Sequence, residues 1–179
     1  MRTQFRPTLI LVAALITGLS AVYSANEKTQ NSPAAAAAED PLTAIFDDSK
    51  WTLQGYTTSS RLKGMIDTKA TEPDAIFVVV FYRVQNLSKK NDPILFGPKL
   101  KDSEGNVFDA MADEGLYMPQ GRKSISLETI NPKLTKSFCA IYEVPKSSTD
   151  LAFGARSLAD DELVEYIPLK AVTRTPAAK

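Results

Sequence analysis

Hydrophobic and polar positions along this chain alternate in a pattern that predicts β-strands. The strongest signal covers residues 76–86, which are rich in β-branched and aromatic residues and end in a regular apolar and polar alternation. Its first seven positions are apolar on both parities, so we expect a central strand. A second strong strand is predicted over residues 135–145. Parity assigns four residues of the first strand to the core face: Val78, Val80, Tyr82 and Val84.

Weaker strand signals surround these two. They lie at residues 51–57, 94–100, 107–108, 124–130, 150–153 and 164–172. Gly55 interrupts the first of them and predicts a β-bulge or a close backbone approach. Pro98 and Pro168 cannot donate to a strand ladder, so we expect their strands at sheet edges or bulges. About seven or eight short strands separated by turn residues predict an all-β fold, an immunoglobulin-like antiparallel β-sandwich.

The predicted sandwich covers residues 41–172 and is flanked by segments of a different composition. Residues 25–40 combine polar residues with a run of five alanines and contain nothing that could build a core. We expect them to form a disordered, Ala-rich linker. The tail, residues 173–179, is expected to be disordered as well.

The first 24 residues have the organisation of an export signal. Arg2 and Arg6 precede an uncharged apolar run, and small residues follow it. We expect residues 1–24 to be a signal peptide that is cleaved after Ser24. The alternative is an uncleaved anchor, because residues 8–25 carry no charge and just reach the length that spans a bilayer. In both cases the sandwich is exported to the periplasm or the extracellular space, and in the second it stays tethered to the inner membrane.

The composition excludes several classes of activity. The chain has 21 Lys plus Arg and 21 Asp plus Glu, so nonspecific electrostatic binding to nucleic acid is not expected. The chain has no His, which excludes imidazole-based catalysis and His-ligated zinc or copper sites. Cys139 is the only cysteine, so no internal disulfide can form. We expect it to be a half-buried, unreactive strand thiol, with an intermolecular disulfide as the alternative.

Four sequence segments together resemble a known family. They are FVVVFYRVQN, PKLKDSEGNVFDA, INPKLTKSFCAIYEVPK and DLAF, in this order between Trp51 and Val172. They are similar to bacterial exported immunoglobulin-like domains of unknown function, a group that includes the mycobacterial immunoprotective extracellular antigen. The resemblance implies an exported β-sandwich and no catalytic residues. Members are often lipoproteins, but this chain has Val22 where lipid attachment requires a cysteine, so we expect no lipid anchor.

A cluster of oxygen-bearing side chains lies around the predicted turn between residues 100 and 107. Asp102, Glu104, Asn106 and Asp109 carry the hard oxygen ligands that Ca²⁺ prefers. Their spacing does not match an EF-hand loop, and a solvated hairpin turn is the alternative. We therefore expect no cofactor, or at most a weak calcium site in a calcium-stabilised structural domain.

Ser60 and Lys63 have the Ser-x-x-Lys spacing of penicillin-recognising enzymes. The companion motifs of those enzymes are missing, and the pair lies in a segment between a strand and a loop, whereas such enzymes place it at the start of a helix. A Ser/Lys hydrolase is therefore only the alternative hypothesis, and we expect the protein not to be an enzyme.

The remaining candidate is a contact surface for a partner. Residues 111–123 contain Gly and Pro and predict a long loop, and long loops often carry the function of a small domain. Tyr117 and Met118 lie in this loop, and both residue types are enriched in interface cores. We expect a non-enzymatic binding module of the bacterial envelope that contacts an unknown envelope or extracellular protein through Tyr117 and Met118, and that touches a membrane only through its N-terminal segment if that is uncleaved.

Overall fold

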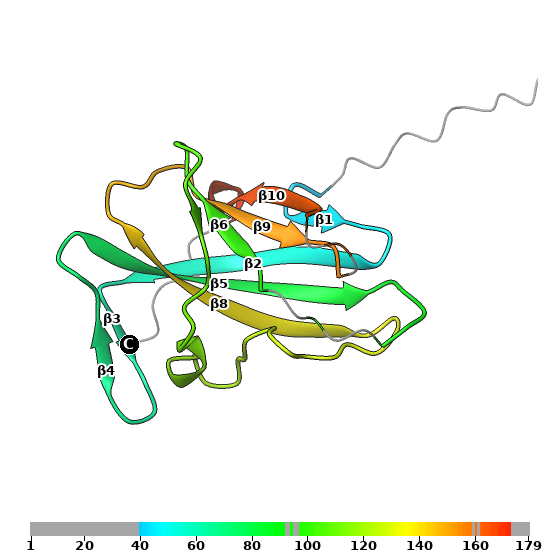
Figure 1. Cartoon of the computed structure of the whole chain (residues 1–179), viewed down its shortest axis with the longest axis horizontal. Coiled ribbons are helices and arrows are strands. Elements are labelled where there is room, and N and C mark those ends of the chain that lie inside the picture. Colours follow the sequence, from blue (N-terminus) through cyan, green and yellow to red (C-terminus); the bar gives the residue numbers. More distant parts are fainter. Residues whose placement is uncertain (1–39, 92–93, 95–96, 159, 161, 173–179) are drawn as a thin grey trace, which may run out of the picture. The chain divides into compact units, whose positions relative to one another are not determined.

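The computed structural model describes residues 40–91, 94, 97–158, 160 and 162–172. The expected signal segment, nearly all of the expected linker and the tail lie outside these described residues. The described part of the chain forms two antiparallel four-stranded sheets and a separate two-stranded hairpin (Figure 1). The all-β antiparallel sandwich predicted from the strand pattern is therefore confirmed.

The elements of each sheet come from distant parts of the chain. The first sheet contains, in spatial order, β1 (Thr43–Ile45), β2 (Ser49–Ser59), β5 (Ala75–Asn86) and β8 (Thr135–Pro145). The second contains β10 (Val164–Pro168), β9 (Ala152–Arg156), β6 (Lys99–Lys101) and β7 (Val107–Phe108). The hairpin consists of β3 (Arg61–Lys63) and β4 (Thr68–Ala70). Two short 3-10 helices also occur, η1 (Glu114–Leu116) and η2 (Leu169–Ala171).

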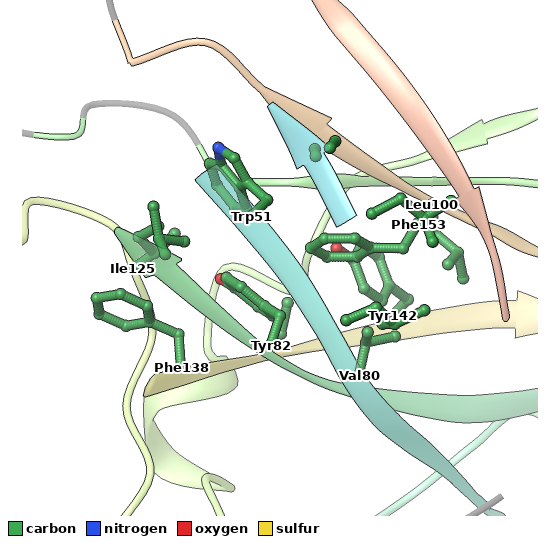
Figure 2. Close-up of a cluster of buried hydrophobic side chains, with 14 of the residues drawn as sticks. Trp51, Val80, Tyr82, Leu100, Ile125, Phe138, Tyr142 and Phe153 are labelled. Carbon is green, nitrogen blue, oxygen red and sulfur yellow. The ribbon is translucent and has the colours of Figure 1, made fainter. Parts of the chain in front are cut away.

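The core between the two sheets is aromatic at its centre (Figure 2). Trp51 of β2 stacks on Tyr82 of β5 with ring centroids 5.5 Å apart, and Phe153 of β9 lies 4.9 Å from Tyr82. Because Phe153 belongs to the second sheet, these rings join the two layers directly. The parity assignment for β5 is confirmed, since four residues are each 0% exposed: Val78, Val80, Tyr82 and Val84.

The glycine and proline signals have different outcomes. The register between β2 and β5 shifts between Leu53 and Gly55, so the predicted bulge is present. β10 is an edge strand that ends at Pro168, as expected. The strand predicted over residues 94–100 is shorter and is not at an edge, because β6 begins after Pro98 and lies between β9 and β7. A proline just outside a strand removes no ladder donor, so it does not force that strand to an edge.

The strand predicted over residues 124–130 does not form. Leu127 adopts a φ of 63°, which breaks an extended run, while Ile125 and Ile130 are each 1% exposed within the core. Two apolar residues can fill a core from an irregular segment that is held by other contacts. Here Asn86, at the end of β5, donates its side-chain amide to the carbonyl of Ile130 at 2.7 Å.

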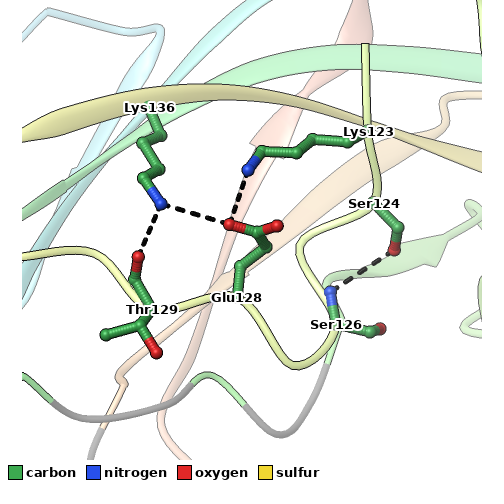
Figure 3. A network of polar contacts seen from close by, with 6 residues as sticks. All are labelled: Lys123, Ser124, Ser126, Glu128, Thr129 and Lys136. Atoms are coloured by element: carbon green, nitrogen blue, oxygen red, sulfur yellow. Dashed lines mark hydrogen bonds and ion pairs between the residues drawn. The ribbon is translucent and has the colours of Figure 1, made fainter.

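An ion-pair network holds the same irregular segment against β8 (Figure 3). The Glu128 carboxylate contacts the ammonium groups of Lys123 at 2.6 Å and Lys136 at 3.2 Å. Lys136, which belongs to β8, also donates to the carbonyl of Thr129 at 2.6 Å. The hydrogen bond from Lys123, followed by that from Lys136, lowers the pKa of Glu128, so this carboxylate stays ionised.

Candidate functional site

The sheet of β2, β5 and β8 buries apolar side chains on both faces. Phe77 and Val79 of β5, with Cys139 and Ile141 of β8, point away from the main core and form a second cluster. Leu62 of the hairpin and Tyr117 of the long loop pack onto these four residues. This second layer explains why the first half of residues 76–86 is apolar on both parities. Partly buried hydrophobics at its margin are Phe81, Met111 and Met118.

Tyr117 holds the hairpin against the long loop. Its side chain is only 7% exposed, and its hydroxyl donates to Asp67 Oδ2 at 3.3 Å. Lys69 of β4 lies 5.7 Å above the ring and pairs with Asp113 at 2.7 Å. The hairpin therefore covers Tyr117, so its ring is not freely exposed as a loop contact residue would be.

Met118 and Cys139 meet beneath the same loop. Met118 is half-buried, and the Cys139 thiol donates to its sulfur at 2.9 Å. Burial raises the pKa of the Cys139 thiol to about 12, and the residue is 0% exposed. A thiol that is both buried and protonated is a poor nucleophile. A direct role of Tyr117 and Met118 in partner binding stays a prediction.

The tip of the hairpin is the most exposed apolar feature of the described residues. A four-residue turn closes β3 and β4, with the amide of Gly64 donating to the carbonyl of Asp67 at 2.7 Å. Between Gly64 and Asp67 in this turn, Met65 is 86% exposed and Ile66 is 95% exposed. Leu116 of η1 is 55% exposed, and its carbonyl accepts the Met65 amide at 3.2 Å. We call Met65, Ile66 and Leu116 the hairpin tip.

The local sequence explains this geometry. A Cβ atom on Gly64 would lie 3.0 Å from the Tyr117 ring and 3.0 Å from the Asp67 carbonyl oxygen, so glycine lets the turn pack this closely without displacing either neighbour. The hairpin tip was not predicted from the strand pattern. The signal that could have found it is the apolar pair Met65 and Ile66 between the turn formers Gly64 and Asp67.

One face of the hairpin is positively charged. The register pairs Arg61 with Ala70 and Lys63 with Thr68, which places these four residues on the face opposite Leu62. Arg61 and Lys63 are both exposed. Since Leu62 points into the second cluster, the cationic face points outward (Figure 1 shows the projecting hairpin).

A cleft of about 580 Å³ opens between the start of β6, residues 109–115 and the end of β9. Glu114 contributes a buried carboxylate, which accepts the Ile141 amide at 2.9 Å and the Ser124 hydroxyl. Burial is the main cause that raises the pKa of Glu114, and the two hydrogen bonds oppose it. Ile141 belongs to the edge strand β8, so Glu114 occupies a donor that a further strand would otherwise need. Arg156, at the end of β9, is 8% exposed and donates to the carbonyl of Gly97 at 3.3 Å.

The four predicted calcium ligands do not form one site. Asp102 Oδ1 accepts the amides of Glu104 at 3.0 Å and Asn106 at 2.9 Å, and Oδ2 accepts the Asn106 side chain at 2.9 Å. These bonds, led by that of the Asn106 side chain, lower the pKa of Asp102. Asp109 instead pairs with Lys99 at 2.9 Å. Within the described ranges, no group of three or more His, Cys, Asp or Glu could hold a metal ion. Calcium binding stays a prediction.

The Ser-x-x-Lys pair does not lie on a helix. Ser60 forms a bend between β2 and β3, Lys63 ends β3, and both are exposed. The spacing brings a serine and a lysine together only on one helix face, so it has no chemical meaning here.

Within the part of the chain that the structure describes, no helix is long and apolar enough to cross a bilayer.

No protein-family model matches the chain, and neither does any curated protein. Solved structures do share its fold. A conserved hypothetical protein from Bacillus anthracis is 18% identical with a TM-score of 0.54, and the match covers 70% of this chain and 91% of that one. A functionally unknown protein from Listeria monocytogenes is 12% identical with a TM-score of 0.50, with coverages of 70% and 79%. A candidate lipoprotein from Bacillus subtilis is 16% identical with a TM-score of 0.51. That match covers 72% of this chain and 39% of the Bacillus subtilis protein. At these identities the likeness shows the fold alone, and the three proteins are named without an established activity.

Proposed function

We propose that this chain is an exported, non-enzymatic module of the bacterial cell envelope that acts by binding another molecule. The observation that carries the proposal is the hairpin tip. A folded protein normally buries adjacent large apolar residues, and an exposed cluster of them marks an interaction site. Met65 and Ile66 are almost fully exposed although Gly64, Tyr117 and Asp67 hold the hairpin in place.

Export is supported by the N-terminal sequence and by one structural neighbour. Residues 1–24 show the basic, apolar and small-residue order of a signal peptide. The Bacillus subtilis neighbour is named as a candidate lipoprotein, a class of exported protein. Val22 replaces the cysteine that would carry a lipid, so release by cleavage or a tether through residues 8–25 are the two routes for this chain.

The resemblance to the exported domain group of the mycobacterial immunoprotective extracellular antigen supports the same function. That resemblance brings no catalytic residues. The chemistry of the described residues agrees with a binding role, because the thiol of Cys139 is buried and Ser60 and Lys63 do not share a helix. In this proposal Tyr117 is a positioning residue, and the contact itself is made by the hairpin tip.

The test is light-activated cross-linking from the tip in cells that export the full chain. A photoreactive amino acid replaces Ile66 in one version and Val107 of β7 in the control, since Val107 is also an exposed apolar residue, at 48%. Mass spectrometry reads the adducts and the mature N-terminus. We expect export and adducts from position 66 well above those from position 107. A chain retained in the cytoplasm, or equal adducts from both positions, would show that the proposal is wrong.

A further inference from the structure

We propose that the hairpin tip docks on an anionic lipid surface, with the side chains of Met65 and Ile66 entering the headgroup region. This inference rests on the proposed function and names its partner class. The sequence pattern places membrane contact only in residues 8–25, and the geometry adds a second contact within the folded domain.

The shape and chemistry of the tip favour lipid over protein. A stable protein interface buries about 800 Å² on each side and is anchored by aromatic and Arg residues. The tip instead has no aromatic residue, and its two most exposed members, Met65 and Ile66, are adjacent on a projecting turn at 86% and 95% exposed. A short apolar projection gains most by entering an apolar phase that closes around it, as interfacial membrane segments do.

The charges around the tip match an anionic surface. Arg61 and Lys63 lie on the outward face of the hairpin, and no acidic residue shares that face. Asp67, beside Ile66, adds one exposed carboxylate to the turn, where it accepts the Tyr117 hydroxyl, so the two cations of the outward face exceed it by one charge. Asp113 is paired with Lys69 on the inner side. The exposed acids that follow β4, Glu72 and Asp74, lie at the end of the hairpin away from the tip. Lys and Arg beside an inserted apolar group bind anionic headgroups.

The N-terminal sequence gives this weak contact a high effective concentration. If residues 8–25 remain as an anchor, a linker of residues 26–40 keeps the domain within reach of the bilayer. A second contact on the same surface is then effectively intramolecular. If the segment is cleaved, the hairpin tip is the membrane contact of the released domain.

The test uses the mature protein as it is isolated from exporting cells. Ile66→Cys carries a polarity-sensitive fluorophore, and Val107→Cys carries it in the control. The native Cys139 does not interfere, because it is 0% exposed and its pKa is raised to about 12. Vesicles contain either phosphatidylcholine alone or an equal mixture with phosphatidylglycerol. We expect a blue shift and quenching by lipid-attached quenchers only at position 66, only on the anionic vesicles, and weaker at high salt.

Charge variants test the electrostatic part. The pair Arg61→Gln and Lys63→Gln should lower partitioning to anionic vesicles about thirtyfold. The matched control, Lys89→Gln with Lys90→Gln, removes the same charge from exposed residues that follow β5, whereas the hairpin precedes β5. This control should change partitioning less than threefold. Equal losses in both pairs would overturn the inference.

Three outcomes separate this inference from the proposed function. If the vesicles bind the protein while the fluorophore at position 66 stays in water, another part of the protein makes the contact, and the inference is wrong. If cross-linking from position 66 in cells captures a protein and no lipid, the lipid inference fails but the binding module stands. If position 66 captures nothing beyond the control, the proposed function fails as well.

Discussion

Glu114 covers the exposed edge of β8, and replacing it tests how the second layer is held. Its carboxylate accepts the amide of Ile141 at 2.9 Å and the hydroxyl of Ser124. Met111 donates its amide to the Ile141 carbonyl at 2.8 Å, and Cys139 donates its own to the Lys123 carbonyl at 3.0 Å. The long loop thus occupies the centre of the strand edge through one side chain and two backbone groups.

The magnitude follows from the groups that each substitution leaves behind. Glu114→Ala leaves the Ile141 amide buried without its acceptor, which should cost about 1–3 kcal/mol of unfolding free energy. Glu114→Gln keeps an oxygen for Ile141, and its amide can donate to Ser124. It also removes a carboxylate whose pKa is raised by burial. We therefore expect the Gln variant to be at least as stable as the wild type at pH 8.

The pH dependence has a definite sign. Because the pKa of Glu114 is higher in the folded chain than in the unfolded chain, the folded state binds its proton more tightly. This contribution to stability is complete below the unfolded pKa, near 4.5, and is lost as the pH rises through the raised folded pKa. The advantage of the Gln variant over the wild type should therefore be largest at pH 8 and shrink towards pH 4.

Urea unfolding followed by the fluorescence of Trp51 measures these differences, since Trp51 is the only tryptophan and is 0% exposed. The reasoning is refuted if Glu114→Ala unfolds within about 0.5 kcal/mol of the wild type. It is also refuted if Glu114→Gln loses as much unfolding free energy as Glu114→Ala. The hydrogen-bond acceptor for the Ile141 amide would then not be the source of the stability.

Three further predictions concern other parts of the fold. Tyr82→Phe should raise stability by about 1 kcal/mol, because the buried Tyr82 hydroxyl has no hydrogen-bond partner among the described residues; a lower urea midpoint would contradict this. Gly64→Ala should cost about 1–3 kcal/mol, since its methyl group would press on Tyr117 at 3.0 Å, and an unchanged midpoint would show that the hairpin shifts freely. Millimolar Ca²⁺ or EDTA should leave the melting temperature unchanged, because Asp102 already accepts several hydrogen bonds; a clear rise with Ca²⁺ would restore the calcium site.

The strand pattern predicted the strands of the two sheets better than the irregular segments that pack against them. Parity located the core face of β5 because a buried sheet face requires an apolar residue at every second position. The same pattern misassigned residues 124–130, because Ile125 and Ile130 fill the core from backbone that side-chain contacts hold in an irregular form. Such tertiary contacts leave no periodic trace in the sequence.

The candidate site was located less well, and Tyr117 shows why. Its loop was identified correctly, but an aromatic residue in a loop can serve an interface or a local core, and composition does not distinguish the two. The deciding partner is Leu62, on a three-residue strand too short to give a periodic signal. Because that hairpin covers Tyr117, the exposed apolar surface lies at the hairpin tip and not at Tyr117.

The central claim is that the hairpin tip serves binding and adds nothing to the stability of the fold. The most direct measurement compares the full chain with the double variant Met65→Ser and Ile66→Ser, both in urea unfolding and in fractionation with envelope membranes after release of loosely bound protein. The account predicts unfolding free energies within about 0.5 kcal/mol of each other, together with a clear loss of envelope association in the variant. A destabilised variant, or one that remains associated as firmly as the wild type, would contradict it.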